Sequence, residues 1–173
     1  EGEPSLRGDE LAAAVGLMRR QTSRGTINMN SNAGRPEAVD KMAKAGLDAL
    51  RVSLASARPE LYNLYHRPRG YGLVQVKESI QRAAARGVRV SLNLLHFPGI
   101  NDREEEIEAL LDLVRTAGVS LIQIRNLNLD PEVYLQLVPP ASGSPLGVPD
   151  FLRILAQELP AVAVGNYTRA VPK

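Results

Sequence analysis

Residues 89–95, RVSLNLL, alternate apolar and polar side chains, which is the pattern of a β-strand with two different faces. Three other stretches repeat this pattern: TINMNSN (26–32), ALRVSLAS (49–56) and LIQIRNLN (121–128). Each is followed by a segment with helical periodicity, and this alternation predicts an α/β fold with parallel strands. Parallel strands that are covered on both faces are normally apolar throughout. We therefore expect helices on one face of this sheet and a polar cavity on the other.

The two faces separate the side chains of the four stretches by polarity. The apolar set, expected beneath the helices, is Ile27, Met29, Leu50, Val52, Leu54, Val90, Leu92, Leu94, Ile122 and Ile124. The polar set, expected inside the curve of the sheet, is Asn28, Asn30, Arg51, Ser53, Ser91, Asn93, Gln123 and Arg125. Burying so many polar groups without partners is costly, so the polar set predicts a bound ligand.

Composition is that of an ordinary folded protein. A chain of 173 residues suits one domain, and we assign 1–173 to a single domain. The 21 basic and 19 acidic residues give a net charge of only +2, which does not favour nucleic acid as a partner. No apolar run approaches the roughly 20 residues of a membrane span. The first residues lack the features of a secretory signal, so the cytoplasm is the expected location. There is no cysteine, which excludes disulfides and thiolate metal sites from this chain.

Helix boundaries follow from capping signals. Asp9 is expected to cap a first helix with Leu11, Val15 and Met18 inward, and Asp102 with Glu105 matches a capping box. The acidic run 104–106 complements the positive end of that helix. Further helices are expected to start at Pro36, Leu73 and Pro131, and helices are expected to end at Gly46, Gly87 and Gly118. The C-terminal part is expected to form a loop over 138–149, a helix over 150–159 and a possible edge strand over 161–167.

Right-handed crossovers between parallel strands curl the sheet toward a barrel, but four strands cannot close one. The expected architecture is therefore a partial (β/α) barrel with about four parallel strands and outer helices. The stretch 26–32 would have an open edge, which invites pairing. A missing N-terminal segment or a second copy of the chain is expected to cover that edge. The opening EGEP resembles a loop that leaves an absent strand, so we expect the chain to be part of a longer protein.

Polar residues at the carboxyl ends of the strands are the candidate site, because α/β barrels place their sites there. Asn30, Ser53 and Asn93 carry amide and hydroxyl groups, which orient ligands but do not act as acids or bases. We therefore predict no catalytic residue. Taken singly, each Asn is better explained as the partner of a neighbour across a polar core, whereas the polar residues of all four strands together favour a ligand. Arg51 and Arg125 need an anion, either Glu3 or a carboxylate or phosphate of a ligand.

The aromatic and histidine residues give weaker signals. His96 follows the third strand, where a site residue could lie, whereas His66 is expected to be exposed. With these two histidines and no cysteine, no metal site is predicted. Tyr62, Tyr65 and Tyr71 are expected to pack the loop after the second strand.

Five motifs in order resemble the radical S-adenosylmethionine (SAM) enzymes. The motifs are GEP, INMNSNAG, LRVSLAS, VSLNLLHFPGIND and IQIRNLNLDP. They are similar to the part of the family's partial (β/α)6 barrel that runs from the exit loop of its second strand to its sixth strand. The resemblance covers residues 1–130 and leaves 131–173, the C-terminal helices and the possible edge strand, unassigned.

The resemblance implies roles for residues near the first two motifs. Gly2 and Glu3 are similar to the end of the family's Gly-Gly-Glu motif, which receives the methionine amino group of SAM; Glu1 stands where the first Gly is usual. Asn30 and Asn32 match the Asn-Thr-Asn-Gly pattern at the end of the third barrel strand.

The later motifs imply further contacts. Ser53 matches a position that commonly contacts the ribose or carboxylate of SAM, and Asn93 resembles the fifth-strand Asn of maturase-type members. Arg125 matches a sixth-strand Arg that faces the site. With Arg51 it is expected to orient a substrate or a carboxylate.

One departure from the family limits what this chain can do. The Cys-x-x-x-Cys-x-x-Cys loop that holds the family's [4Fe–4S] cluster is absent. The expected function is therefore that of the C-terminal part of a radical SAM enzyme, which orients SAM and an unidentified substrate for 5′-deoxyadenosyl radical chemistry. The parent protein would use SAM and the cluster, whereas this chain alone is expected to bind neither and to be inactive. Two alternatives are a non-catalytic scaffold that dimerises or binds a partner, and a fragment of a cofactor-free (β/α) barrel lyase or aldolase.

Overall fold

A five-stranded parallel sheet forms the centre of the molecule. The computed structural model describes residues 2–127, 129–140 and 143–165. The strands lie side by side in chain order: β1 (Asn28–Ser31), β2 (Ala49–Leu54), β3 (Arg89–His96), β4 (Val119–Asn126) and β5 (Ala163–Val164). The α/β class and the parallel strands are confirmed. The possible edge strand over 161–167 is confirmed as β5, with 166–167 outside the described residues.

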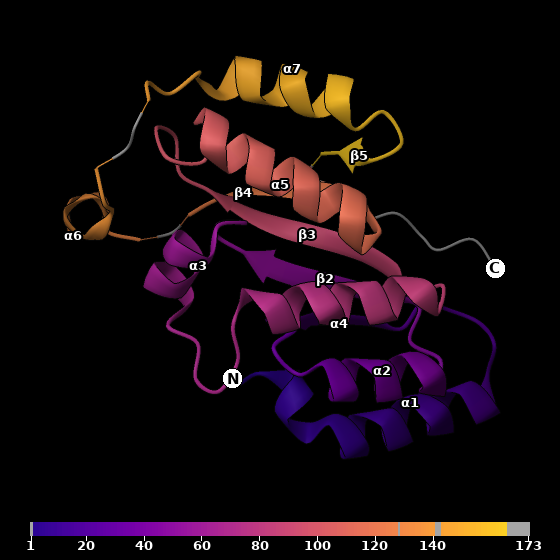
Figure 1. The fold of residues 1–173 in the computed structure, drawn as a ribbon. Coiled ribbons are helices and arrows are strands. Elements are labelled where there is room, and N and C mark those ends of the chain that lie inside the picture. The colour runs from indigo at the N-terminus through magenta and orange to yellow at the C-terminus, as the bar shows by residue number, and fades with distance from the viewer. Residues whose placement is uncertain (1, 128, 141–142, 166–173) are drawn as a thin grey trace.

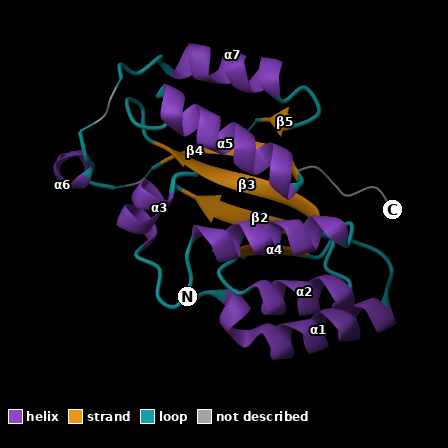
Figure 2. Ribbon diagram, in the orientation of Figure 1, coloured by secondary structure: helices purple, strands orange, loops and turns teal. Residues whose placement is uncertain are grey.

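Helices cover one face of the sheet. The described residues form the 3₁₀ helix η1 (Pro4–Arg7) and the α-helices α1 (Gly8–Gln21), α2 (Pro36–Ala45), α3 (Pro59–His66), α4 (Leu73–Ala85), α5 (Glu104–Ala117), α6 (Pro131–Leu137) and α7 (Val148–Glu158). In Figure 1, α4 and α5 lie in front of the strands, α2 lies below α4, α7 lies above α5, and α1 packs on α2. The short helices α3 and α6 lie beyond the carboxyl ends of the strands, at the left of Figure 2.

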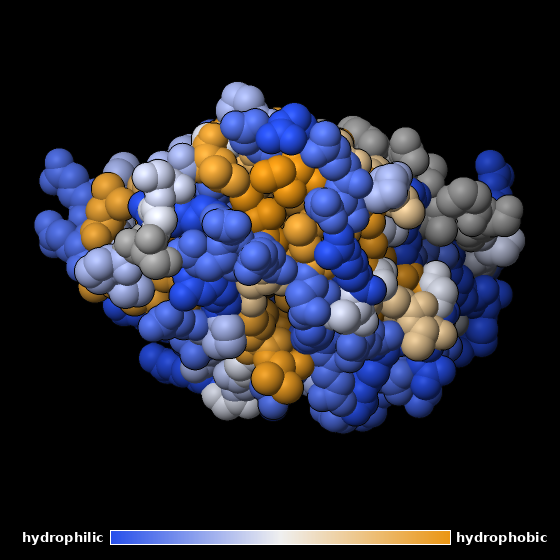
Figure 3. Space-filling model, turned by 45° about the horizontal axis from the view of Figure 1, so that its top comes forward, coloured by the Kyte–Doolittle hydropathy of each residue, from blue (hydrophilic) through white to orange (hydrophobic). Residues whose placement is uncertain are grey.

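The apolar side of the sheet is the core of the protein. Leu50, Val52 and Leu54 of β2, with Leu92 of β3 and Ile122 of β4, are fully buried. They contact the inward faces of the helices in one continuous hydrophobic cluster. The outward faces of the helices are largely hydrophilic, with separate hydrophobic patches between them (Figure 3). Helices therefore cover the apolar face, as the alternation predicts.

Glycine ends two helices at the positions expected from the sequence. Gly46 follows α2 with φ of 112°, and Gly118 follows α5 with φ of 82°. Both values lie in the left-handed region, which glycine adopts without steric cost. At the other end of α2, Pro36 occupies the first turn. These local signals fix the lengths of the helices that cover the sheet.

Two capping predictions are wrong. Asp9 does not cap α1, because η1 runs directly into α1 and moves its start to Gly8. The carboxylate of Asp9 instead pairs with Lys41 on α2, at 2.6 Å. Asp102 does not cap α5 either, because its two oxygens accept hydrogen bonds from the N–H groups of Gly99 (2.6 Å) and Gly147 (3.1 Å). Asp102 thus ties the loop after β3 to the start of α7.

The prediction that Met18 faces inward is wrong, because its side chain is 44% exposed on the outside of α1. None of the helices in the described ranges combines the length and the apolarity that crossing a membrane requires.

Candidate functional site

The register of the sheet aligns the polar residues in rows across the strands. Asn30 of β1 lies opposite Arg51 of β2. Ser53 of β2 lies opposite Asn93 of β3, which lies opposite Gln123 of β4. Neighbouring strands are about 4.8 Å apart, so one ligand can contact several of these side chains at once. The predicted polar residues therefore share one face, on the side of the sheet away from the helices.

Glu3 accepts three hydrogen bonds, and two of them join it to the carboxyl end of β1. Its Oε1 accepts from the N–H of Ser5 (2.8 Å) and from the hydroxyl of Ser31 (2.5 Å). Its Oε2 accepts from the N–H of Asn32 (2.7 Å). Hydrogen bonds to a carboxylate are short and strong, so this group fixes the N-terminal segment against the loop that follows β1.

The loop after β1 is held in a tight turn. The side-chain oxygen of Asn32 accepts from the N–H of Gly34 (2.9 Å), and the hydroxyl oxygen of Ser31 accepts from the N–H of Ala33 (2.9 Å). Ala33 has φ of 56°, a left-handed conformation that is unusual for a residue with a Cβ. Its carbonyl accepts a hydrogen bond from the hydroxyl of Ser79 on α4 (2.6 Å). The turn therefore places the Glu3 carboxylate and the Asn32 backbone in a fixed position beside the sheet.

A pocket of about 270 Å³ opens beside this turn. Glu3 and Asn32 line it together with Arg35, Arg69 and Tyr71. Because the Tyr71 ring packs closely on the chain here, a Cβ on Gly34 would come within 2.5 Å of it. A cavity lined by two arginines and by apolar surface thus adjoins the predicted methionine-binding end of the site.

The other predicted residues lie at different depths on the polar face. Ser53 and Asn93 are half-buried neighbours, whereas Asn30 is exposed and its side-chain oxygen accepts from Asn28 (3.2 Å). Arg125 is exposed near the carboxyl end of β4. Gly2 is exposed next to Glu3. The fold thus brings Glu3, Asn30 and Asn32 to one strand end, with the remaining candidates on the adjoining strands.

His96 is not part of the polar face. It is the last residue of β3 and shares the helix-covered side with Leu94. Its ring is 5% exposed and stacks on Phe151 of α7, with 4.9 Å between ring centroids. Burial lowers the pKa of the imidazole, which favours its neutral form. The proposal that His96 is a site residue is therefore corrected to a core position.

The prediction that His66 is exposed is also wrong. Its Nε2 accepts a hydrogen bond from the N–H of Ala55 (3.2 Å), and its ring stacks on Tyr62 at 4.4 Å. Burial lowers the pKa of the imidazole to about 4. This histidine joins α3 to the end of β2 and is structural.

The depressed pKa of His66 predicts a loss of stability in mild acid. The unfolded chain binds a proton near pH 6.5, whereas the folded chain does so only near pH 4. The contribution of His66 to the free energy of unfolding is therefore fully present above pH 6.5. It falls by about 2 kcal/mol as the pH drops toward 4. Urea unfolding at intervals of 0.5 pH unit measures the loss. The variant His66→Gln, which keeps an acceptor for Ala55, should lose less between pH 6.5 and 4.5; parallel curves would contradict the prediction.

The sequence pattern did not indicate some of the polar residues near the site. Ser31 and Ser5 are almost fully buried, and both donate to Glu3. The alternation of β1 places Ser31 on the apolar side, which gives no signal for a polar role. Its neighbours Asn30 and Asn32 were the only sequence hint.

The chain alone does not fit the metal cluster implied by the resemblance. It has no cysteine, and the described residues contain no group of three or more His, Asp or Glu side chains that could hold a metal. The polar face does fit a polar organic ligand, because it offers amide, hydroxyl and guanidinium groups on adjacent strands.

Comparison with known structures supports the barrel assignment. A domain of pyruvate-formate lyase-activating enzyme from Bacteroides vulgatus superposes with a TM-score of 0.66 at 14% identity, covering 97% of this chain and 96% of that one. Methylornithine synthase superposes with a TM-score of 0.63 at 14% identity, covering 93% of this chain and 46% of that one. At these identities the likeness is one of fold.

Sequence comparison identifies the family. A protein of Methanosarcina acetivorans named "Probable GTP 3′,8-cyclase" is 32% identical over 143 residues, which are 79% of this chain and 40% of the relative. The chain thus spans less than half the length of that relative. The model of the Radical SAM superfamily, whose members use SAM and a [4Fe–4S] cluster, matches residues 1–114. The chain belongs to the Radical SAM superfamily.

Proposed function

We propose that this chain is the SAM- and substrate-orienting part of a radical SAM enzyme, and that it acts with a cysteine-bearing segment outside this sequence. The chain has no cysteine, and it spans 40% of a relative with which it shares 32% identity. In this proposal the family's cluster is supplied by another part of the protein. Membership of the Radical SAM superfamily argues against a cofactor-free lyase or aldolase as the parent.

The hydrogen-bonded group around Glu3 is the observation that carries the proposal. It holds a carboxylate at the carboxyl end of β1, where the carboxylate accepts hydrogen bonds from the hydroxyl of Ser31 and the N–H of Asn32. A carboxylate in this position suits the ammonium group of the SAM methionine. The oxygen Oε2 accepts a single protein hydrogen bond in the described structure, so it retains capacity for a ligand donor.

The other residues of the polar face have binding roles in this account. Ser53 and Asn93 would donate to and accept from the ribose or the carboxylate of SAM, which supplies the 5′-deoxyadenosyl group for hydrogen abstraction. Arg51 and Arg125 would orient anionic groups of SAM or of the substrate. None of these side chains acts as an acid, a base or a nucleophile.

We propose an anionic substrate, and GTP is the first compound to test. Two guanidinium groups on the polar face are chemically suited to phosphate. The relative named for GTP 3′,8-cyclase activity covers 79% of the chain, which supports this choice. If the Arg125→Ala variant binds GTP at least tenfold more weakly than the unchanged protein, GTP is supported as the substrate. Equal GTP affinity in the two proteins would contradict this choice.

The role of the polar row can be tested by SAM binding to the longer protein proposed here. Ser53→Ala and Asn93→Ala each remove one hydrogen-bonding group, and each is expected to weaken SAM binding about five- to tenfold. Gln81→Ala, which removes an exposed amide on α4, is the matched control. Isothermal titration measures the three affinities. Equal SAM affinity in all variants would overturn the assigned roles.

A non-catalytic scaffold is the second candidate, and the sheet edge favours it. In the described residues β1 pairs only with β2, which leaves its other edge open for a second copy of the chain. Sedimentation of the chain separates the two accounts. A tight dimer that weakens when Asn28→Pro blocks the edge would support the scaffold, whereas a monomer supports the enzyme part.

A further inference from the structure

A second pocket shares no lining residue with the predicted SAM site. Its volume is about 280 Å³, and it lies between the first turns of α3 and α5 and the segment 138–140 after α6. Five charged side chains line it: Arg58, Glu60, Arg103, Glu105 and Glu106. Leu61, Ile100 and residues 138–140 provide an apolar wall. The pocket therefore combines charge with a hydrophobic surface, as small-molecule sites do.

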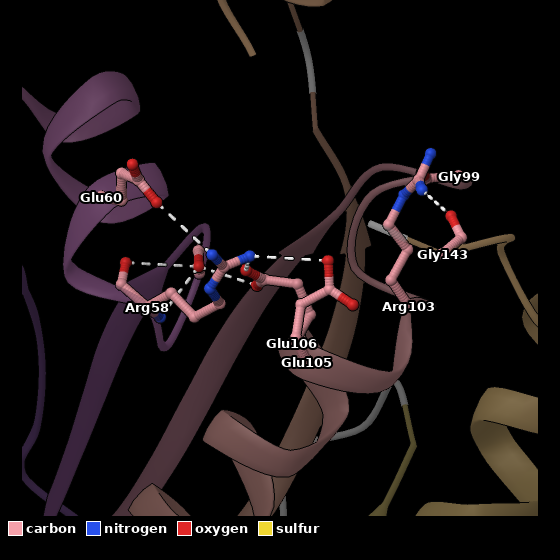
Figure 4. Close-up of polar contacts among 8 residues, drawn as sticks. Arg58, Glu60, Gly99, Arg103, Glu105, Glu106 and Gly143 are labelled. Atoms are coloured by element: carbon pink, nitrogen blue, oxygen red, sulfur yellow. Dashed lines mark hydrogen bonds and ion pairs between the residues drawn. The ribbon is translucent and has the colours of Figure 1, made fainter. Parts of the chain in front are cut away.

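Three carboxylates in this pocket surround one guanidinium. Arg58 lies 3.4 Å from Glu60, 3.7 Å from Glu105 and 3.6 Å from Glu106, and Figure 4 shows its head group between them. Charged hydrogen bonds of this type are normally 2.7–2.9 Å long. Arg58 thus balances the carboxylates only loosely, and it does not exhaust their capacity to accept hydrogen bonds.

The second arginine is used for structure. The Nε of Arg103 donates to the carbonyl of Gly99 (2.6 Å), and its Nη1 donates to the carbonyl of Gly143. In Figure 4 this guanidinium points away from the group around Arg58. With Arg103 held by backbone carbonyls, the unused bonding capacity of the pocket consists mainly of acceptors.

Glu106 is the acceptor that a hydrogen-bond donor from a ligand would stabilise most. It is 3% exposed, and its Oε2 accepts from the hydroxyl of Ser56 (2.7 Å). Its Oε1 is buried and accepts no hydrogen bond from any described residue, and its ion-pair partner, Nη1 of Arg58, lies 3.6 Å away, beyond hydrogen-bond length. A buried carboxylate oxygen that accepts no hydrogen bond is costly, so a closer donor placed in the pocket would reduce this cost. Burial also raises the pKa of the carboxyl, which a bound cation would oppose.

We propose that this pocket binds a small alkyl cation, an ammonium or guanidinium group on a short apolar chain. The cation would donate to Oε1 of Glu106 and lie near Glu105. The alkyl chain would contact Leu61, Ile100 and Val138. With all five side chains ionised the pocket carries one net negative charge, which a monovalent cation neutralises. This inference does not depend on the proposed function.

Titration of the 173-residue chain with n-butylammonium and n-butylguanidinium tests the proposal. Backbone amide NMR shifts of the isotope-labelled chain report the site and the affinity. Both cations should saturate the signals of residues around 58–61 and 103–106, whereas 1-butanol and butyrate should bind at least tenfold more weakly. Saturation elsewhere, or equal binding by 1-butanol, would overturn the proposal.

Two glutamine variants give a matched comparison. Glu106→Gln preserves size and an acceptor for Ser56, and it should weaken binding of both cations at least tenfold. Glu104→Gln changes an exposed carboxylate on the same turn that does not line the pocket, and binding should stay within twofold. If Glu106→Gln does not fold, Glu105→Gln replaces it, with an expected weakening of at least threefold. Unchanged binding in the folded pocket variant would overturn the proposal.

The source of the cation can be distinguished in the same experiment. The capped peptide acetyl-Gly-Lys-Gly-amide carries the same ammonium group on a polypeptide. Tighter binding than n-butylammonium would assign the site to a lysine side chain, and weaker binding to a free amine. A failure of all three cations to bind would contradict this inference and leave the SAM site untouched, because the two share no residues.

Discussion

Replacing Glu3 with alanine is expected to weaken SAM binding by the longer protein about 100-fold. The change removes the proposed partner of the SAM ammonium, and a hydrogen bond between charged groups contributes roughly 1.5–3 kcal/mol. It also frees the hydroxyl of Ser31 and the N–H of Asn32, which Glu3 fixes at 2.5 and 2.7 Å. Both effects act at the same strand end, so their sum should exceed that of any other single change on the polar face.

Calorimetric titration with SAM checks this expectation. Glu3→Gln keeps an acceptor and loses the charge, so its affinity should fall between those of the wild type and Glu3→Ala. Glu10→Ala is the control, because Glu10 is an exposed carboxylate that pairs with Arg7 on the outside of α1. A threefold change or less in folded Glu3→Ala would show that Glu3 only caps η1.

Replacing Leu92 with alanine should give the largest loss of stability. Leu92 is fully buried in β3, which pairs with β2 on one side and β4 on the other. Removing its side chain leaves a cavity between the sheet and the helices, at a cost of about 2–5 kcal/mol.

Urea unfolding followed by circular dichroism measures this loss. The matched control is Leu17→Ala on the outside of α1, where the side chain is 53% exposed and the cost should be below about 0.5 kcal/mol. Equal losses in the two variants would contradict the assignment of the sheet's apolar face to the core.

The parts of the fold that depend on local pattern were predicted correctly from the sequence. The alternation in 89–95 reflects which side chains point to each side of a strand, and Leu92 and Leu94 are indeed buried. Gly46 and Gly118 end helices because a left-handed residue is needed there, whatever the rest of the chain does.

The errors concern contacts that the capping and polarity patterns do not show. Asp102 has the spacing of a capping box, but Gly147, 45 residues later, takes one of its oxygens. His66 lies in a polar stretch, yet the N–H of Ala55 and the ring of Tyr62 cover it. The contact with Gly147 follows from no spacing rule, whereas Tyr62 lies four residues before His66 on α3, a spacing that places the two rings on one face of the helix.

The candidate site was predicted in part for the same reason. Strand alternation placed Ser53 and Asn93 on one face, and the register makes them neighbours. The hydrogen bond from Ser31 to Glu3 could not be predicted, because it joins residues 28 apart that are separated by η1 and α1. The acidic run that includes Glu106 was interpreted only as a favourable helix start, because its pocket also needs the segment 138–140.

The central claim is that this chain orients SAM but depends on a cysteine-bearing segment for its chemistry. The most direct test is reductive cleavage of SAM under anaerobic conditions, with iron, sulfide and dithionite, by the longer natural protein and by the 173-residue chain in parallel. The account predicts that the longer protein carries three cysteines at the cluster spacing and releases 5′-deoxyadenosine, while the chain alone releases none. Release of 5′-deoxyadenosine by the chain alone, or a natural protein without those cysteines, would contradict it.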